Sequence, residues 1–277
     1  LLDYGASTAS VRFICGTQDI HQLLEADIAK FHGTEAALTY SSCWAANTGL
    51  FAAICGVGDV ILSDELNHAS LIDGIRATAK HVVRDVYKHS DMADLEAMLK
   101  AHADAPSRLI VMDKIDIFTG TLGKALGAGT GGFVAGPKAV TETLIQRSRP
   151  HLFSNALHAS VAAAGRKSLE LLAQNPDRVT ALQAKAAKFR ALLNNLDLKP
   201  LPGDSAVVPV IVGETATAIR LAGELLNRGI FVTGFGFPVV PEGEARLRFQ
   251  ISAAHTEAEL EEAAIALKDC LQSPGSP

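Results

Sequence analysis

The sequence predicts an α/β protein with a mostly parallel sheet, and two features of its apolar pattern lead to this class. Segments with apolar residues at three-and-four spacing, as in amphipathic helices, alternate with apolar runs that are too short for helices. Most of these runs lack two-residue alternation, which is typical of strands buried on both faces of a parallel sheet. No stretch of about 18 uncharged apolar residues occurs, so we expect no membrane span.

The predicted elements alternate regularly through the first half of the chain. The first helix has Asp19 and Gln22 at the spacing of a capping box and ends before Gly33. The second helix ends before Gly56. We expect helices at 19–31 and 43–54, followed by strands at 60–62, 82–87, 109–112, 115–118 and 133–135.

The second half changes character and predicts a separate, small α+β domain. In its last strand Leu247, Phe249 and Ile251 alternate with polar residues, so this strand has one apolar face. Thr256 and Glu259 have the spacing of a capping box for the final helix. The predicted domains are 1–172 and 173–277, and the second half contains expected helices at 160–172, 177–194 and 217–228 and strands at 207–212 and 246–251.

The composition excludes several classes of protein. The chain has 277 residues, a net charge of −5 and 48% hydrophobic residues, as in soluble globular proteins. Its mild acidity argues against nucleic-acid binding. Its four cysteines include no C-x-x-C pair, which excludes zinc ribbons and thioredoxin-like sites and indicates a reducing compartment. We therefore expect a small-molecule partner and no metal site.

Lys124 is a candidate nucleophile. It follows an apolar strand, and the small residues of 119–124 would let a planar cofactor approach the backbone, a context that suits a Schiff-base lysine. The alternative is a solvated lysine in a glycine-rich loop. The nearby segment 127–132 matches G-x-G-x-x-G but precedes a strand instead of joining a strand to a helix, so we predict no dinucleotide site.

Three further positions could bind charged or planar groups. The segment 41–47 opens a helix, whose free N–H groups suit a phosphate, although a serine of this segment could simply cap the helix. His68 follows the strand at 60–62, at the edge where open α/β folds bind ligands, or it is a structural histidine. Arg248 could bind a carboxylate through two hydrogen bonds, or it is an exposed strand arginine.

Motifs in seven segments make the prediction more specific: ASVRFICGTQD (9–19), YSSC (40–43), SDELNHAS (63–70), GTLGKALG (120–127), RSRPHLFSN (147–155), TGFGFPVVP (233–241) and RLRFQISAAH (246–255). In order and over nearly the whole chain, these segments resemble the α-oxoamine synthases, a family of fold-type-I enzymes that use pyridoxal 5'-phosphate (PLP). Within the family, SVRFICGTQ is most similar to the glycine C-acetyltransferases, while sister enzymes make 8-amino-7-oxononanoate, 5-aminolevulinate or 3-ketosphinganine.

The resemblance implies an activity and a setting. It implies a PLP-dependent acyltransferase that interconverts glycine plus acetyl-CoA with 2-amino-3-oxobutyrate plus CoA in threonine catabolism. The alternative within the family is an 8-amino-7-oxononanoate synthase. The resemblance also implies a homodimer with shared active sites, in the bacterial cytoplasm or the mitochondrial matrix.

The resemblance assigns roles by position as well. Lys124 would carry PLP, His68 would stack on its ring, and these two are the expected catalytic residues. Arg248 would bind the carboxylate of the amino acid. The other expected cofactor contacts are Ser42, Cys43, Trp44 and Thr121, with Ser154 and Asn155 approaching the cofactor of the partner subunit.

The chain departs from the family pattern between Val111 and Met112. There the family continues through roughly sixty further residues, about two βα units. They include an aspartate that holds the pyridine nitrogen protonated and a histidine that contacts the ring hydroxyl, and no residue of this sequence takes either role. Either the protein has this segment and the sequence joins its flanks, or the segment is deleted. We favour the first, because losing buried strands exposes backbone groups and apolar surface. A deleted chain could act as an inactive dimer partner.

Overall fold

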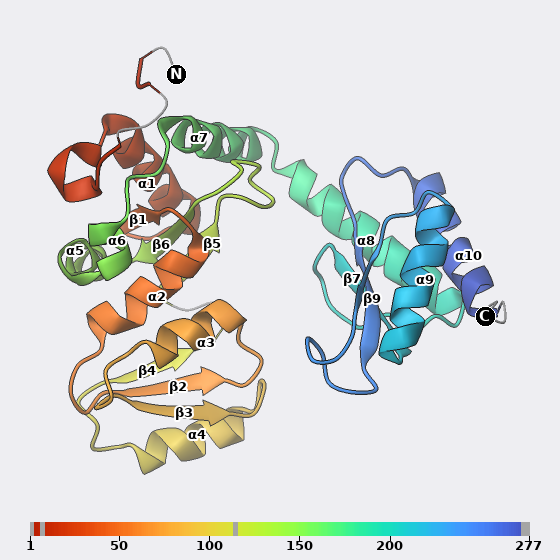
Figure 1. The fold of residues 1–277 in the computed structure, drawn as a ribbon, viewed down its shortest axis with the longest axis horizontal. Coiled ribbons are helices and arrows are strands. Elements are labelled where there is room, and N and C mark those ends of the chain that lie inside the picture. Colours follow the sequence, from red (N-terminus) through yellow and green to blue (C-terminus); the bar gives the residue numbers. More distant parts are fainter. Residues whose placement is uncertain (1–2, 6–8, 113–115, 273–277) are drawn as a thin grey trace. The chain divides into compact units, whose positions relative to one another are not determined.

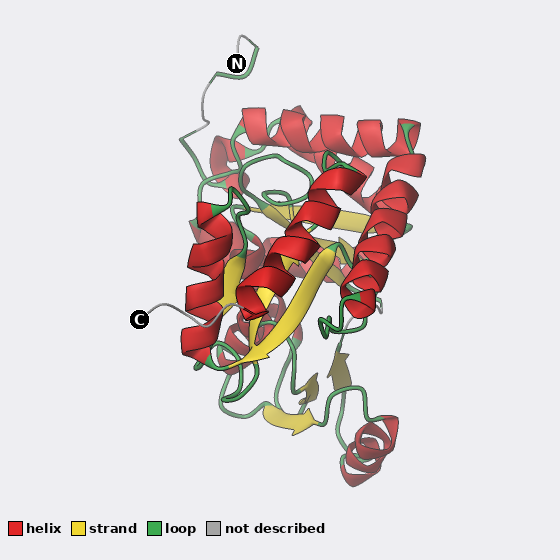
Figure 2. Ribbon diagram, turned by 90° about the vertical axis from the view of Figure 1, so that its right-hand side faces the viewer, coloured by secondary structure: helices red, strands yellow, loops and turns green. Residues whose placement is uncertain are grey.

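The computed structural model describes residues 3–5, 9–112 and 116–272. The chain divides into two compact units, Leu1–Ala173 and Gln174–Pro277 (Figure 1; helices are red and strands yellow in Figure 2). Among the described residues no helix is both long and apolar enough to cross a bilayer.

The first unit alternates helices and strands from its N-terminal end. Its elements are η1 (Arg12–Gly16, one wide helical turn), α1 (Asp19–His32), β1 (Ala36–Tyr40), α2 (Cys43–Ile54), β2 (Val60–Asp64), α3 (Ala69–Arg76), β3 (Val83–Tyr87), α4 (Met92–Ala101), β4 (Arg108–Val111), β5 (Phe118–Thr121), β6 (Gly132–Gly136), α5 (Lys138–Arg147), α6 (Arg149–Phe153) and α7 (Ala159–Gln174).

Two predicted details of this unit were wrong. The capping box of α1 is formed by Gln18 and His21, because the helix takes Gln18 as its N-cap, one residue before Asp19. The strand predicted at 115–118 is instead β5, which starts at Phe118, and residues 113–115 lie outside the described part of the chain. The end of α1 at Gly33 is as predicted, since this glycine has a φ of 68°.

The strands of the first unit form two three-stranded sheets. One has the order β3-β2-β4 and is parallel, which confirms the parallel pattern expected for these runs. The other has the order β1-β6-β5, with β6 antiparallel to both neighbours. Only six residues separate β4 from β5. Parallel neighbours in one sheet need a crossover of about ten or more residues, so these two strands cannot pair directly in that way.

Helix α2 joins the two sheets through a shared core. Its sequence is apolar nearly all round, as expected for a helix buried on several sides. Its residues Ala46, Leu50 and Phe51 pack in one cluster with Leu38 of β1 and Ile61 of β2. The start of α2 is therefore held at a fixed place beside both sheets.

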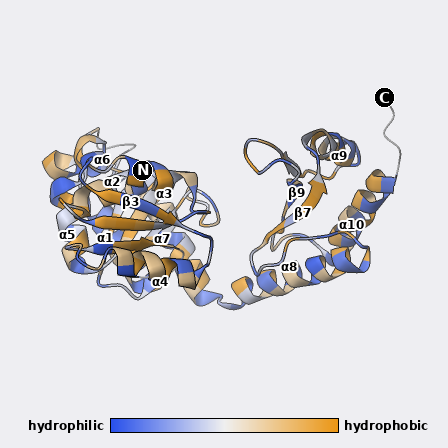
Figure 3. Cartoon of the chain, turned by 90° about the horizontal axis from the view of Figure 1, so that it is seen from below, coloured by the Kyte–Doolittle hydropathy of each residue, from blue (hydrophilic) through white to orange (hydrophobic). Residues whose placement is uncertain are grey.

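The second unit has its own antiparallel sheet, order β7-β9-β8, and three long helices. Leu247 and Phe249 of β9 are buried, and Arg248 between them is exposed, as the alternation predicts. Thr256 and Glu259 form the predicted capping box. Apolar residues mark the strand β7 in orange in Figure 3. The elements are α8 (Asp177–Asn195), β7 (Val207–Gly213), α9 (Thr215–Asn227), β8 (Thr233–Phe235), β9 (Ala245–Gln250) and α10 (Glu257–Gln272).

Candidate active site

The first turn of α2 packs directly on the start of β6. Ser42 caps the helix, since its Oγ accepts a hydrogen bond from the amide of Ala45 at 3.1 Å. Gly132 lies so close that a Cβ on it would be 2.3 Å from the backbone nitrogen of Cys43. Only glycine fits there, and the amide-rich start of a helix is a favourable place for a phosphate.

Lys124 lies in the tight loop that joins β5 to β6. The amide of Gly127 donates to the carbonyl of Lys124 at 2.9 Å, and Gly127 has a φ of 65°. The side chain of Lys124 is exposed. Burial raises the pKa of the Cys43 thiol, and the positive charge of Lys124 and a hydrogen bond with Thr119 oppose that rise. The structure thus brings the predicted lysine into the electrostatic neighbourhood of the α2 N-terminus.

Thr121 ends β5, and its hydroxyl is already used within its own loop. Its Oγ1 donates to the carbonyl of Gly131 and accepts from the amide of Gly123, both at 3.2 Å. Because a hydroxyl has a single proton, Thr121 can donate to a phosphate only by giving up its bond to Gly131.

His68 is the N-cap residue of α3, just after the carboxyl end of β2. Its Nδ1 accepts from the amide of Ser70 at 3.1 Å, and its side chain is exposed. The adjacent Asn67 donates to Ser63 Oγ at 3.0 Å and to the carbonyl of Val111 at 2.7 Å, so it ties this loop to the end of β4. The sequence reasoning missed Asn67, although it lies inside the SDELNHAS motif.

Two of the predicted cofactor contacts, Trp44 and Asn155, have other partners. Trp44 is exposed, and its Nε1 donates to Asp73 on α3 at 3.2 Å. Asn155 pairs through its backbone with Val11. Ser154, directly before it, is half-buried. The described contacts of Trp44 and Asn155 therefore do not connect these residues to Lys124.

Arg248 lies in the second unit, on the exposed face of β9. Its guanidinium carbon is 5.8 Å from the ring centroid of Phe235, and in the described part of the chain no carboxylate forms an ion pair with it. Arg246, two residues before it, is bound to Glu244 at 3.0 Å. Of these two arginines, Arg248 is the one left available for a carboxylate ligand.

Comparison with known proteins identifies the family. The family model "Aminotransferase class I and II" matches residues 3–107 and 100–267. The chain belongs to this family. It is 40% identical to the mitochondrial 2-amino-3-ketobutyrate coenzyme A ligase of Bos taurus, over 94% of this chain and 74% of that one. The 2-amino-3-ketobutyrate coenzyme A ligase of Escherichia coli K12 is also 40% identical, over 91% and 77%. The 8-amino-7-oxononanoate synthase of Symbiobacterium thermophilum is 35% identical, over 94% and 79%.

Solved structures agree with the fold. A serine palmitoyltransferase of Sphingomonas wittichii superposes with a TM-score of 0.86 at 24% identity, covering 98% of this chain and 80% of that one. An 8-amino-7-oxononanoate synthase of Francisella tularensis gives a TM-score of 0.78 at 23% identity, covering 98% and 90%. These findings confirm the predicted fold-type-I class, the resemblance to the ligases and the prediction of a PLP-dependent acyltransferase.

The relatives also show that residues are missing from this family member. The alignment with the bovine ligase spans 313 residues, whereas 94% of this chain is about 260, so the relative has about 50 residues without a counterpart here. The family model matches in two segments that meet at 100–107, directly before β4. The junction of the two segments thus lies a few residues before the departure that the sequence predicts between Val111 and Met112.

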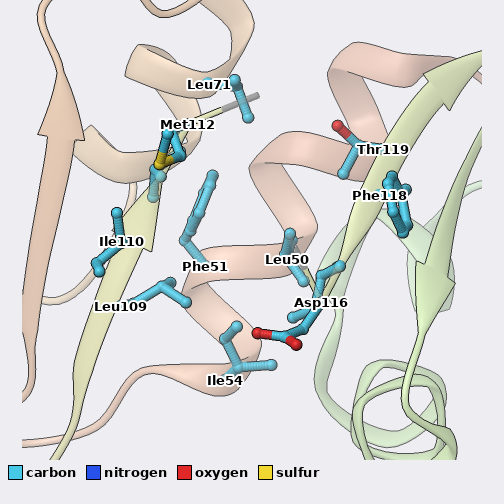
Figure 4. Close-up of a pocket in the computed structure, with 12 residues that line it drawn as sticks. Leu50, Phe51, Ile54, Leu71, Leu109, Ile110, Met112, Asp116, Phe118 and Thr119 are labelled. Carbon is cyan, nitrogen blue, oxygen red and sulfur yellow. The ribbon is translucent and has the colours of Figure 1, made fainter. Parts of the chain in front are cut away.

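A cavity of about 260 Å³ lies between β4 and β5. Figure 4 shows the strand segment with Leu109 and Met112 and the segment with Phe118 on opposite sides of the α2 residues Leu50 and Phe51. Most of the residues lining this cavity are apolar, as expected on a helix that strands of a sheet cover.

The residues of the first unit fit two groups of PLP, its phosphate and its aldehyde carbon. The capped start of α2 beside Gly132 suits the phosphate. The nearby Lys124 suits the carbonyl carbon. PLP sites also place an acid or an arginine at the ring nitrogen. Burial opposes ionisation of Asp64, but hydrogen bonds from the amides of Ser90 and Leu66 and from His89 hold its pKa below the usual value. Asp64 is thus committed elsewhere, and the described residues offer no obvious partner for the ring nitrogen.

Proposed function

We propose that this protein catalyses the reversible condensation of glycine with acetyl-CoA to 2-amino-3-oxobutyrate and CoA, mainly toward glycine in threonine breakdown. The observation that carries the proposal is the 40% identity to 2-amino-3-ketobutyrate coenzyme A ligases of a mammal and a bacterium over more than nine-tenths of this chain. The SVRFICGTQ motif favours the same branch of the family.

Each residue has a defined task in this proposal. PLP supplies an electron sink for the carbanion formed at the glycine Cα. Lys124 holds the cofactor and then accepts or returns the Cα proton at its Nζ. His68 restricts movement of the ring, and the α2 start with Ser42 binds the phosphate. Arg248 orients the substrate through its carboxylate.

The assembly and compartment belong to the same proposal. We assign the protein to a homodimer in which Ser154 and Asn155 approach the partner subunit's cofactor. Relatives include mitochondrial and bacterial proteins, which supports a mitochondrial matrix or a bacterial cytoplasm as its location.

The test is a substrate comparison with PLP-loaded protein. Release of CoA from acetyl-CoA with glycine, and not from pimeloyl-CoA with alanine, supports the proposal. The reverse preference supports the second candidate, an 8-amino-7-oxononanoate synthase, which the Symbiobacterium relative favours. Turnover with neither pair, in protein that dimerises, supports the third candidate, an inactive dimer partner, which the open edges of β4 and β5 favour.

A further inference from the structure

We infer that Asn47 and Ser70 are positioning residues that hold His68 as a neutral imidazole with its proton on Nε2. The inference concerns the site of the proposed function and deepens it. It rests on a chain of hydrogen bonds that runs from α2 through α3 to His68, and each bond in the chain fixes the direction of the next.

The first of these hydrogen bonds involves a backbone amide, and the amide N–H is certain to be the donor. The N–H of Ser70 points to Nδ1 of His68 at 3.1 Å. An amide N–H can only donate, so Nδ1 must accept. A nitrogen that accepts carries no proton, and the neutral ring then has its proton on Nε2.

The side chain of Ser70 forms the next hydrogen bonds of the series. Its Oγ lies 2.7 Å from the same Nδ1. Because Nδ1 is an acceptor, the hydroxyl must donate to it. The lone pairs of this Oγ are then left to accept, and Nδ2 of Asn47 lies 2.8 Å away and donates to it. The amide of Asn47 is therefore fixed with its nitrogen, not its oxygen, toward Ser70.

Burial and close helix packing stabilise the hydrogen bonds that connect Asn47 to Ser70 and Ser70 to His68. Asn47 is 2% exposed and Ser70 is 6% exposed, so water does not compete for these bonds. The helices approach closely because residue 74 is glycine: a Cβ there would lie 2.4 Å from the carbonyl oxygen of Asn47.

Asn47 also carries an unfavourable feature that a purely structural residue would avoid. Its Oδ1 is buried and has no hydrogen-bond partner among the described residues. Leaving a buried acceptor unpaired costs about 1–3 kcal/mol, and an apolar residue of similar size would avoid it. An asparagine at this position is explained by the hydrogen bond that its Nδ2 donates to Ser70 Oγ.

The consequence falls on His68. With Nδ1 engaged twice, the ring has a fixed orientation, and its Nε2 has no described partner, so the Nε2 proton is available to a bound ligand.

The test is ¹⁵N NMR of the ring nitrogens in histidine-labelled full-length protein, with His68→Gln to assign the His68 signals. In the wild type we expect an unprotonated Nδ1 and a protonated Nε2. In Asn47→Asp the carboxylate can only accept, so the Ser70 hydroxyl turns toward it and Nδ1 keeps only the Ser70 amide as a donor. The ring signals should then move away from the wild-type values and part of the way toward those of protonated Nδ1. Asn194→Asp, the same change at an exposed residue of the second unit, should leave them unchanged.

Two results overturn the inference: a protonated Nδ1 in the wild type, or unchanged His68 signals in folded Asn47→Asp. If Asn47→Asp does not fold, Ser70→Ala replaces it. With one donor left on Nδ1, the His68 signals should average between both tautomers, and signals identical to wild type would overturn the inference. The measurement needs neither PLP nor turnover, so its failure is distinguishable from a failed acyl-transfer assay.

Discussion

At the scale of single residues, Lys124 carries the most direct prediction. Sodium borohydride reduction of PLP-loaded protein should leave the pyridoxyl group on Lys124, because its amine is exposed beside the α2 start. Peptide mapping by mass spectrometry locates the label. Lys124→Ala should abolish labelling, while Lys138→Ala, at an exposed lysine on α5, should not. A label on another lysine would reject the assignment.

Arg248 gives a second residue-level prediction. Its planar fork can pair both oxygens of a carboxylate, and lysine offers only a point charge. Arg248→Lys should weaken glycine binding by about 1.5–3 kcal/mol, measured as an increase in the KM for glycine. The matched control is Arg246→Lys, because Arg246 shares the strand face and is already bound to Glu244. A glycine defect in the control alone would show that the wrong arginine was chosen.

His151 predicts how stability depends on pH. It is 5% exposed, and burial together with the charge of Arg12 lowers its pKa to about 4. In the unfolded chain the pKa is about 6.5, so the unfolded state takes up the proton first as the pH falls. Stability due to His151 is complete above about pH 6.5. It is lost at about 1.4 kcal/mol per pH unit between about 6.5 and about 4.

Urea unfolding at pH 7, 6 and 5 measures this effect. His151→Phe keeps a ring beside Tyr40 and removes the titration, so its free energy of unfolding should fall less with acidification than that of the wild type. His81→Gln, which removes an exposed histidine, should follow the wild type. Equal slopes for wild type and His151→Phe would contradict the prediction.

At the scale of elements, β4 and β5 are the features that need explanation. Each pairs on one side only among the described strands, and the cavity between them is lined mainly by apolar side chains. Such edges are prone to aggregation. Inserting the extra segment of the bovine ligase between Val111 and Met112 should raise the thermal midpoint, since each apolar side chain newly buried adds up to about 1.5–3 kcal/mol.

The control is a glycine-serine linker of equal length at the same point. A flexible insert adds only loop entropy and covers nothing, so it should lower the midpoint slightly or leave it unchanged. If linker and segment give the same midpoint, the open edges are not the place of the missing residues.

The elements also show what a sequence can and cannot predict. Helix α2 was predicted to the residue, because a capping serine, an apolar run and a following glycine mark it locally. The cap of α1 was displaced by one residue, since its box is made by Gln18 and His21, a pair that common cap preferences do not favour. The split of the first unit into two sheets depends on pairing between strands that are far apart in the sequence, and no local pattern reports such pairing.

The candidate site also contains residues that local sequence predicts and residues that it does not. Ser42 and His68 are N-cap residues of helices, and Lys124 lies in the loop that follows β5, which are places where local motifs predict functional residues. Asn47 and Ser70 were missed because their hydrogen bond joins residues 23 positions apart and depends on how α2 packs on α3. Contacts of this kind follow from tertiary packing and leave no periodic signal.

At the scale of the whole molecule, the second unit has a core of its own. Its buried apolar residues form one cluster that includes Phe189 of α8, Val208 of β7, Leu221 of α9, Leu247 of β9 and Leu267 of α10. Every member of this cluster belongs to the unit Gln174–Pro277. A domain with a continuous core is expected to fold without its neighbour.

The last prediction follows from this separate core. Residues 174–277 expressed alone should unfold in a single cooperative transition, measured by circular dichroism during heating. Within this fragment Leu247→Ala should lower the free energy of unfolding by about 2–5 kcal/mol, because Leu247 is 0% exposed and truncation leaves a cavity. Ile219→Ala, at a residue 67% exposed on α9, should change it by less than about 1 kcal/mol. A fragment with no cooperative transition would show that the core of the second unit requires the first unit to form.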